Sequence, residues 1–497
     1  MAAVSPMAQS RRKLNMHNRR NTMGFGIVSA IAIAYAALPA CNMQAQSQAL
    51  PEAPKASLFL SAAQNPPNPA AQAAPAQAQA MTALSNSAEP NAPKLTIAQA
   101  EQMALKHNPN ISVAQLFALA QQQVTREVFS AELPTVTGSL TAVDANLNGR
   151  ITAGGLPNAR ILNRAAGGAL VDDLITDFGH TGNLVRSAKF NAKAQVEKEK
   201  ATELDITLVT DQAFYAALTA QAVLKVAKET VYQRQSTDEQ VRALTKFKIR
   251  SDVDLSFADV QVSRAQLFLL DAQNNEETTM AALDDVLGLE KNTQYSLVDE
   301  TNNHPEPAPD DPEAMVKLAF TQRPDLAALN STYTADQHYA RAERDLWMPS
   351  ITALGGAGGE PVRSDSIQRS WYAVAGVNVN VPIFNGFLFN AEESQAKLQA
   401  RAAQEQVRNL TDNIARDVRT AVFNAQTAYQ KIAVTEQMLY QANYSLALAS
   451  ARYKMNLSGI VEITQAQLEQ AQAAVDNATA RYNYQTAMAI LHYELGE

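Results

Sequence analysis

The feature that most constrains the fold of this 497-residue chain is an internal duplication. Four short landmarks occur in the same order in both halves, and their separations agree to within a few residues. The pairs are Pro109 and Pro324, Pro134 and Pro349, Gly179 and Gly386, and Leu287-Gly288 and Leu495-Gly496. Matching landmarks at one spacing predict a structural unit built twice. We place the first repeat at residues 95–304 and the second at 305–497, each ordered helix, strand, strand, long helix, helix.

Two short segments with alternating side chains are expected after the proline-ended helix of each repeat. In residues 135–142, Val136, Gly138, Leu140 and Ala142 alternate with Thr and Ser, and residues 371–382 alternate in the same way. Alternation over about 10 residues is typical of a membrane strand with lipid on one face and water on the other. A soluble β-sandwich is the alternative. The glycine-rich run 355–359 is expected to form a loop beside a strand.

Very long helices are predicted after the strands. Between Gly386 and Tyr453 there is no proline or further glycine, which allows about 100 Å of helix at 1.5 Å per residue. Small and apolar residues recur there with alternating steps of four and three, the pattern of a left-handed coiled coil. The positions are Ala421, Ala425, Ala428, Ile432, Thr435, Leu439, Ala442, Leu446, Ala449 and Tyr453. A second seam is expected at Val461, Leu468, Ala471, Val475, Ala478 and Tyr482, and the first repeat has a similar helix over 180–247.

The first 94 residues are expected to be a targeting segment followed by a tether. A basic stretch followed by an apolar one predicts a signal peptide over residues 1–40, with a membrane anchor as the alternative. The single cysteine, Cys41, follows Leu38-Pro39-Ala40 and resembles the lipobox cysteine of bacterial lipoproteins, which predicts acylation. Ordinary cleavage nearby, with Cys41 incidental, is the other interpretation. Residues 41–94 are rich in Ala, Gln and Pro, which predicts a disordered tether.

Composition excludes several classes of protein. The mean hydropathy of −0.21 is too low for a bundle of membrane-spanning helices. The net charge is −8, and removal of a leader with five basic residues makes it −13, which disfavours binding to nucleic acid. The six histidines are scattered without ligand spacing, so we expect no metal, no cofactor and no enzymatic activity.

The strands and helices together predict an oligomer. One chain supplies about four strands, whereas a closed membrane barrel needs at least eight and open strand edges are excluded from lipid. Three chains would give twelve strands. The long helices carry polar faces, with Gln395, Lys397, Gln399 and Arg401 in one stretch, so they must extend into an aqueous compartment.

The ordered set of proline-ended helices, strand-ending turns at Asp177-Phe178-Gly179 and Phe384-Asn385-Gly386, and long helices resembles the TolC-like outer-membrane efflux proteins. The resemblance covers residues 95–497. It implies a mainly α chain with a transmembrane β part, forming a homotrimer with a 12-stranded barrel in outer-membrane lipid, continued by a periplasmic α-helical barrel. It also implies passive conduction in a tripartite efflux or type I secretion system with a periplasmic adaptor (membrane fusion) protein and an inner-membrane pump. The alternative is a periplasmic or surface coiled-coil scaffold without a barrel.

The resemblance also suggests functional positions. Adaptor-contact tips are implied at Ile249, Arg250 and Ser251 and at Leu457, Ser458 and Gly459. A narrow aperture is implied at Tyr453, Glu462 and Gln465, with Asp252 and Asp254 as further acids; Gln465 lacks the charge usual at its place. Rings of carboxylates at a pore mouth favour cations. The alternative is that these acids only stabilise helix N-termini.

Overall fold

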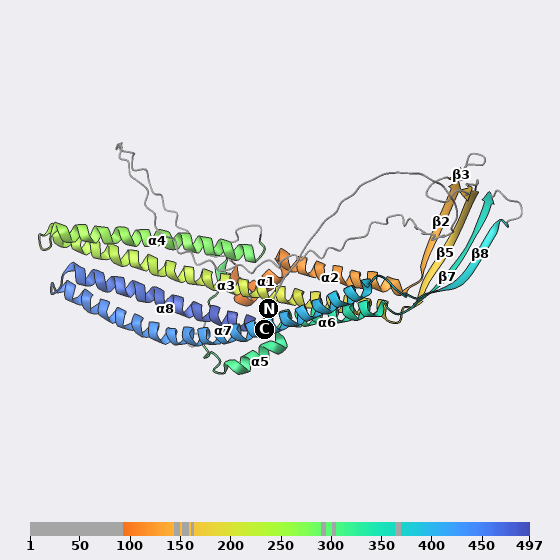
Figure 1. Cartoon of the computed structure of the whole chain (residues 1–497). Helices are drawn as coiled ribbons and strands as arrows, with labels where there is room; N and C mark the ends of the chain where they lie inside the picture. Colours follow the sequence, from red (N-terminus) through yellow and green to blue (C-terminus); the bar gives the residue numbers. More distant parts are fainter. Residues whose placement is uncertain are drawn as a thin grey trace, which may run out of the picture. The chain divides into compact units, whose positions relative to one another are not determined.

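The computed structural model describes residues 93–143, 150–151, 159–160, 164–289, 295–300, 305–362 and 369–497. The predicted leader, Cys41 and nearly all of the predicted tether lie outside these residues. The described part consists mainly of helices (Figure 1), together with one four-stranded sheet and two short two-stranded sheets.

The same order of elements occurs in both halves of the described chain. The helices are α1 (Ile97–His107), α2 (Pro109–Phe129), α3 (His180–Lys246), α4 (Asp252–Val286), α5 (Pro312–Gln322), α6 (Pro324–Asp345), α7 (Leu388–Lys454) and α8 (Ile460–Leu495), with a short 3-10 turn over Ser130–Glu132. The strands are β1 (Lys94–Leu95), β2 (Thr135–Val143), β3 (Arg150–Ile151), β4 (Ala159–Arg160), β5 (Arg164–Thr176), β6 (Ser296–Leu297), β7 (Ser350–Val362) and β8 (Trp371–Asn380). A helix pair, a strand pair, a long helix and a shorter helix therefore appear twice.

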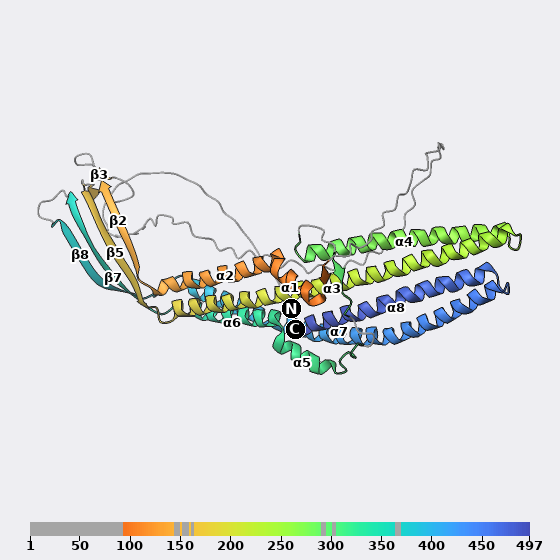
Figure 2. The ribbon, with the colours of Figure 1, turned by 180° about the vertical axis from the view of Figure 1, so that it is seen from behind.

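The long helices form two antiparallel hairpins, α3 with α4 and α7 with α8, which Figure 2 shows from behind. Both α3 and α7 contain 67 residues, close to the predicted length. On α7 the predicted seam agrees with burial: Ile432, Thr435, Leu439, Ala442, Leu446 and Ala449 are buried or half-buried, and every other position from 433 to 448 is exposed. Small residues at the seam allow the two helices of the hairpin to approach closely.

The seam predicted for the start of α8 is wrong. Val461 is 65% exposed and Leu468 is 55% exposed, whereas Ile463, Thr464, Ala466 and Gln467 are buried. The reason is that α8 packs on α3 as well as on α7, so its buried face is rotated away from a simple two-helix seam.

The four long strands form an antiparallel sheet in the order β2-β5-β7-β8. Two strands come from each half, and the pairing of β5 with β7 joins them. The predicted loop at 355–359 is wrong, because these residues lie inside β7 and pair with both β5 and β8. Glycines are accommodated there because large neighbours cover them: a Cβ on Gly356 would come within 2.7 Å of the Leu170 side chain.

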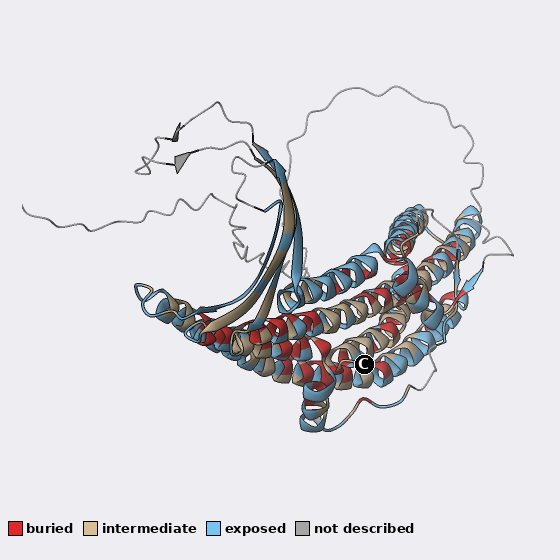
Figure 3. Cartoon of the chain, turned by 90° about the vertical axis from the view of Figure 1, so that its right-hand side faces the viewer, coloured by how far each residue is buried: buried red, intermediate tan, exposed pale blue. Residues whose placement is uncertain are grey.

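The two faces of this sheet differ in chemistry. Val136, Leu140 and Val377 lie on one face and are 67%, 92% and 64% exposed. The opposite face carries all the Thr, Ser and Asn side chains of β2 and β8. As Figure 3 shows, buried residues gather on the helices, while the sheet is mostly exposed. No helix in the described ranges is long and apolar enough to cross a membrane.

Tight left-handed turns connect the sheet to the long helices. Phe178 and Gly179 have φ values of 57° and 117° before α3, and Gly386 and Phe387 have 67° and 65° before α7. Two consecutive residues with positive φ reverse the chain within a very short span, and glycine tolerates this conformation best. The third landmark of the duplication therefore marks the passage from strand to long helix.

Candidate functional site at the helical tips

The predicted tips are the turns that connect the two helices of each hairpin. Lys248 in the first turn and Asn456 in the second adopt left-handed conformations, with φ of 58° and 61°. Ser251 begins α4 with a capping box in which its hydroxyl accepts from the Asp254 amide at 3.2 Å, and the Asp254 carboxylate accepts from the Ser251 amide. Gly459 begins α8 without a side-chain cap.

The two turns contact each other through Arg250. Its Nη2 donates to the Ser458 carbonyl oxygen at 3.0 Å, and its guanidinium lies 4.8 Å from the centre of the Tyr453 ring. Tyr453 is only 2% exposed and packs with Val241, Ala258, Ile460 and Ile463. Burial raises the pKa of the Tyr453 hydroxyl, Arg250 opposes this rise, and Asp254 adds to it. The aromatic ring is thus buried in the contact between the hairpins.

The other positions suggested for the aperture lie at the surface of the chain. Glu462 forms an ion pair with Arg452 at 2.9 Å, and Gln465 donates to Glu469 at 3.0 Å. Asp252 is exposed in the first turn of α4, and Asp254 is half-buried as part of the capping box. The structure therefore brings Tyr453 and Arg250 together but does not gather the acids. Glu462 pairs with Arg452, Asp254 belongs to the capping box, and Asp252 is exposed to solvent.

Exposed apolar side chains surround the two turns. Ile249 and Leu457, both predicted tip residues, are 56% and 66% exposed. Phe247 and Met455, which we did not single out from the sequence, are 74% and 63% exposed. Their signal in the sequence is an apolar residue next to a helix-ending turn, where solvent-exposed residues are normally polar.

A buried arginine joins the hairpins further from the tips. Arg234 of α3 is 5% exposed, and its guanidinium donates to the Thr464 carbonyl oxygen and, at 2.8 Å, to Gln467 Oε1 on α8. Gln467 in turn donates to the Thr237 hydroxyl at 2.9 Å. Burial lowers the pKa of Arg234 from its usual value. No local sequence pattern predicts this contact, because Arg234 is separated from Thr464 and Gln467 by 230 or more residues along the chain.

The landmarks of the duplication meet in space at the other ends of α4 and α8. Asn108, which precedes Pro109, donates from Nδ2 to the Val286 carbonyl oxygen at 3.0 Å near the end of α4. A Cβ on Gly288 would lie 2.7 Å from the His107 carbonyl oxygen, so only glycine fits there without displacement. The first hairpin thus ends against the helix pair that begins its own repeat.

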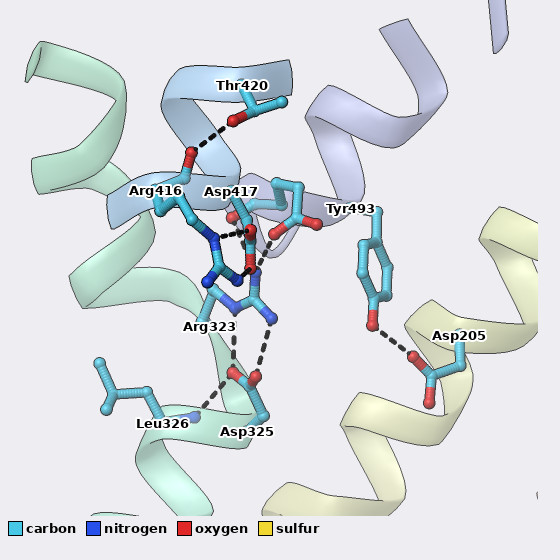
Figure 4. Close-up of polar contacts among 9 residues, drawn as sticks. Asp205, Arg323, Asp325, Leu326, Arg416, Asp417, Thr420 and Tyr493 are labelled. Atoms are coloured by element: carbon cyan, nitrogen blue, oxygen red, sulfur yellow. Dashed lines mark hydrogen bonds and ion pairs between the residues drawn. The ribbon is translucent and has the colours of Figure 1, made fainter. Parts of the chain in front are cut away.

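The second repeat forms the same junction with charged groups. Arg323, which precedes Pro324, pairs with Asp325 at 2.8 Å and with Glu494, and it donates to the Glu494 carbonyl oxygen at 3.3 Å. Figure 4 shows Arg323 facing Asp325, and Tyr493 facing Asp205 of α3. Burial raises the pKa of the Glu494 carboxyl, although Arg323 opposes this rise.

A pair of carboxyl groups connects α1 to α3. Burial, together with repulsion from and hydrogen bonding to Glu101, raises the pKa of Asp211 to about 7. Burial also raises the pKa of the neighbouring Tyr215 to about 12, with Asp211 and Glu101 contributing. Within the described part of the chain, no group of three or more His, Cys, Asp or Glu side chains could hold a metal ion.

These features define an internally duplicated protein whose coiled-coil hairpins continue from an amphipathic antiparallel sheet. The chain belongs to the outer membrane efflux protein family, whose model matches residues 100–289 and 315–497. It is an outer-membrane protein of the TolC-like type.

A relative of known name and two solved structures are similar to this chain. The outer membrane protein TolC of Salmonella enteritidis is 26% identical over 326 residues, which is 60% of this chain and 64% of that protein. The chain thus matches slightly less than two thirds of the length of that relative. The structure of CusC aligns with a TM-score of 0.71 at 19% identity over 80% of this chain and 92% of CusC. The structure of VceC from Vibrio cholerae aligns with a TM-score of 0.71 at 16% identity over 80% of this chain and 96% of VceC. At such identities the structural likeness concerns the fold.

Proposed function

We propose that three copies of this chain close a 12-stranded barrel in the outer membrane, and that the barrel continues as a periplasmic tube of α-helices. The observation that carries this proposal is the amphipathic sheet, in which the edge strands β2 and β8 each pair with one neighbouring strand only within the described residues. Lipid would cover the apolar face, and the edges of neighbouring chains would pair. Closure is required because unpaired backbone groups are strongly unfavourable in hydrocarbon.

The trimer would act as the exit channel of a tripartite efflux or type I secretion system. Conduction through it is passive, and an inner-membrane pump supplies the energy. The exposed apolar side chains Phe247, Ile249, Met455 and Leu457 at the tips support a docking surface for a periplasmic adaptor protein, because such residues are unfavourable in contact with water alone.

Trimer closure is tested by a charge placed on either face of one strand. Ala375 lies on the same face of β8 as Val377, in a row with Val136, Val171 and Gly355. Ala375→Lys puts a cation on this apolar face, which costs about 2 kcal/mol per chain in the membrane. Asn378→Lys is the control on the opposite face of the same strand. We expect wild type and Asn378→Lys to fractionate with outer membranes as cross-linked trimers, and Ala375→Lys to do so poorly. A monomer or dimer in the soluble fraction for all three proteins would instead favour a scaffold without a barrel.

We also propose that the tips form the narrow aperture. Glu462 would face the pore together with its copies in the trimer, and Tyr453 would act by holding the two hairpins together. Glu462→Ala in planar bilayers tests the first role. We expect weaker block by divalent cations and a changed conductance, since a carboxylate ring attracts cations. Unchanged block and conductance would exclude Glu462 as a gate residue.

For the N-terminal segment, we propose that residues 1–40 are removed and that Cys41 carries a lipid. Mass spectrometry of the mature protein tests this directly. An unmodified N-terminus downstream of Cys41 would exclude lipidation.

A further inference from the structure

One row of residues runs straight across the four-stranded sheet. Ser139 of β2 pairs with Gly168 of β5, Gly168 pairs with Gly358 of β7, and Gly358 pairs with Tyr372 of β8. Directly paired residues in antiparallel strands point to the same face. This face is the one with the Thr, Ser and Asn side chains of β2 and β8, so it faces the lumen in the proposed barrel.

The two glycines of this row form a recess under the tyrosine. A Cβ on Gly358 would lie 2.5 Å from the Tyr372 hydroxyl and 2.6 Å from its ring carbon Cζ. A Cβ on Gly168, one strand further, would overlap the same hydroxyl and lie 3.1 Å from Cζ. The ring of Tyr372 therefore reaches sideways over β7 toward β5, close to the backbone. It remains 41% exposed, because its outer face is uncovered.

We propose that Gly168 and Gly358 hold Tyr372 against the barrel wall, and that this position sets the free width of the channel mouth. The inference rests on the proposed channel function. Tyr372 is the second residue of β8, whose other end leads into α7, so the ring lies at the end of the strand away from the helices. Three chains would place three such rings at one level. A Tyr372 ring turned away from the barrel wall would project into the lumen instead of lining it.

The glycines differ in how well they test this idea. At Gly358 a Cβ would also lie 2.6 Å from the Gly167 carbonyl oxygen, so alanine would shift the backbone. At Gly168 the nearest atom is the end of the Tyr372 side chain, which can move, and the nearest backbone atom, the Ala357 carbonyl oxygen, is 3.0 Å away. Gly168→Ala should therefore displace the ring into the lumen with little change to the strands.

The sheet supplies a matched control. Gly376 lies on the same face of β8 as Tyr372, but a Cβ there would meet only the Leu354 side chain, at 3.7 Å or more. Gly376→Ala thus adds the same methyl group to the lumen face without touching Tyr372.

The experiment measures the width of the mouth by polymer exclusion. The full chain is reconstituted in planar bilayers. Neutral polymers of increasing size are added on the side of the bilayer where Tyr372 lies, opposite the helices. Polymers small enough to enter lower the single-channel conductance. We expect Gly168→Ala to shift the size limit to smaller polymers, Tyr372→Ala to shift it to larger ones, and Gly376→Ala to leave it unchanged. The double variant Gly168→Ala/Tyr372→Ala should behave like Tyr372→Ala.

Two results would overturn the inference while leaving the channel function intact. One is a conducting Gly168→Ala channel with the size limit of the wild type. The other is a reduced limit that persists in the double variant, because it would reflect a distorted backbone and not a displaced ring. A wild-type chain that forms no channel would overturn the proposed function itself, and this inference with it.

Discussion

The buried guanidinium of Arg234 allows a quantitative test of how the hairpins are held together. It is 5% exposed and serves two acceptors on α8, the Thr464 carbonyl oxygen and Gln467 Oε1. Hydrogen bonds to a charged group contribute about 1.5–3 kcal/mol each. Against this stands the loss of hydration on burial, which also lowers the pKa of Arg234. We therefore expect Arg234→Ala to weaken the contact between α3 and α8 by about 3 kcal/mol.

Hydrogen exchange at the start of α8 measures this loss locally. Local opening that becomes easier by about 3 kcal/mol exposes the amides of residues 463–467 roughly 100-fold more often. Mass spectrometry of peptides from this segment would report the faster exchange. Arg242→Ala is the control on the same helix, since Arg242 pairs with Asp238 and Asp259 inside the first hairpin, at 3.0 and 2.7 Å. Exchange of this segment in Arg234→Ala at the rate of wild type would refute the reasoning.

Three further predictions concern the junctions at the start of each repeat. Gly288→Ala and Gly386→Ala both place an alanine at a positive φ, but only the methyl group at Gly288 meets backbone atoms. In denaturant titrations, Gly288→Ala should therefore lower the free energy of unfolding by about 2 kcal/mol more than Gly386→Ala does. Arg323→Ala leaves two carboxylates without their cation, and it should lower that free energy by about 3–5 kcal/mol, whereas replacement of the exposed Arg416 should change it little. The pKa of Asp211 rises to about 7 in the folded state, so between about pH 4 and about pH 7 the folded state binds more protons than the unfolded state. The free energy of unfolding therefore falls as pH rises through this range. The variant Asp211→Asn should lose this part of the pH dependence of the melting temperature, and an equal pH dependence in wild type and variant would contradict the assignment.

The sequence predicted those elements whose pattern is local. The heptad spacing on α7 needs only one neighbouring helix, so its positions from Ile432 to Ala449 agree with burial. The alternation in β2 and β8 likewise separates two faces of different chemistry. The seam of α8 failed at Val461 and Leu468 because α8 has a second partner in α3, and a linear pattern does not reveal two partners at once.

The glycines show a different limit of the sequence. The run at 355–359 suggested a loop because glycine favours turns, but its neighbours in space are large side chains such as Leu170 and Tyr372 from other strands. These contacts between the glycines and large side chains exist only once the strands are paired. Similarly, Pro109 and Gly288 were both recognised as landmarks, yet their meeting at one junction depends on a helical hairpin of more than a hundred residues between them.

Two backbone carbonyl groups of the second repeat, near the candidate site, accept hydrogen bonds from arginines. Arg234 and Arg250 both belong to the first repeat, and both donate to backbone carbonyls of the second, at Thr464 and Ser458. The first hairpin has a complete capping box at Ser251, whereas Gly459 gives the second no side-chain cap. These two acceptors are backbone atoms, so substitution of their own side chains leaves them in place. The other acceptor of Arg234, Gln467 Oε1 on α8, is lost when Gln467 is replaced. Substitution of Arg234 or Arg250 therefore weakens the contact between the two hairpins without changing any residue of the seam between α7 and α8.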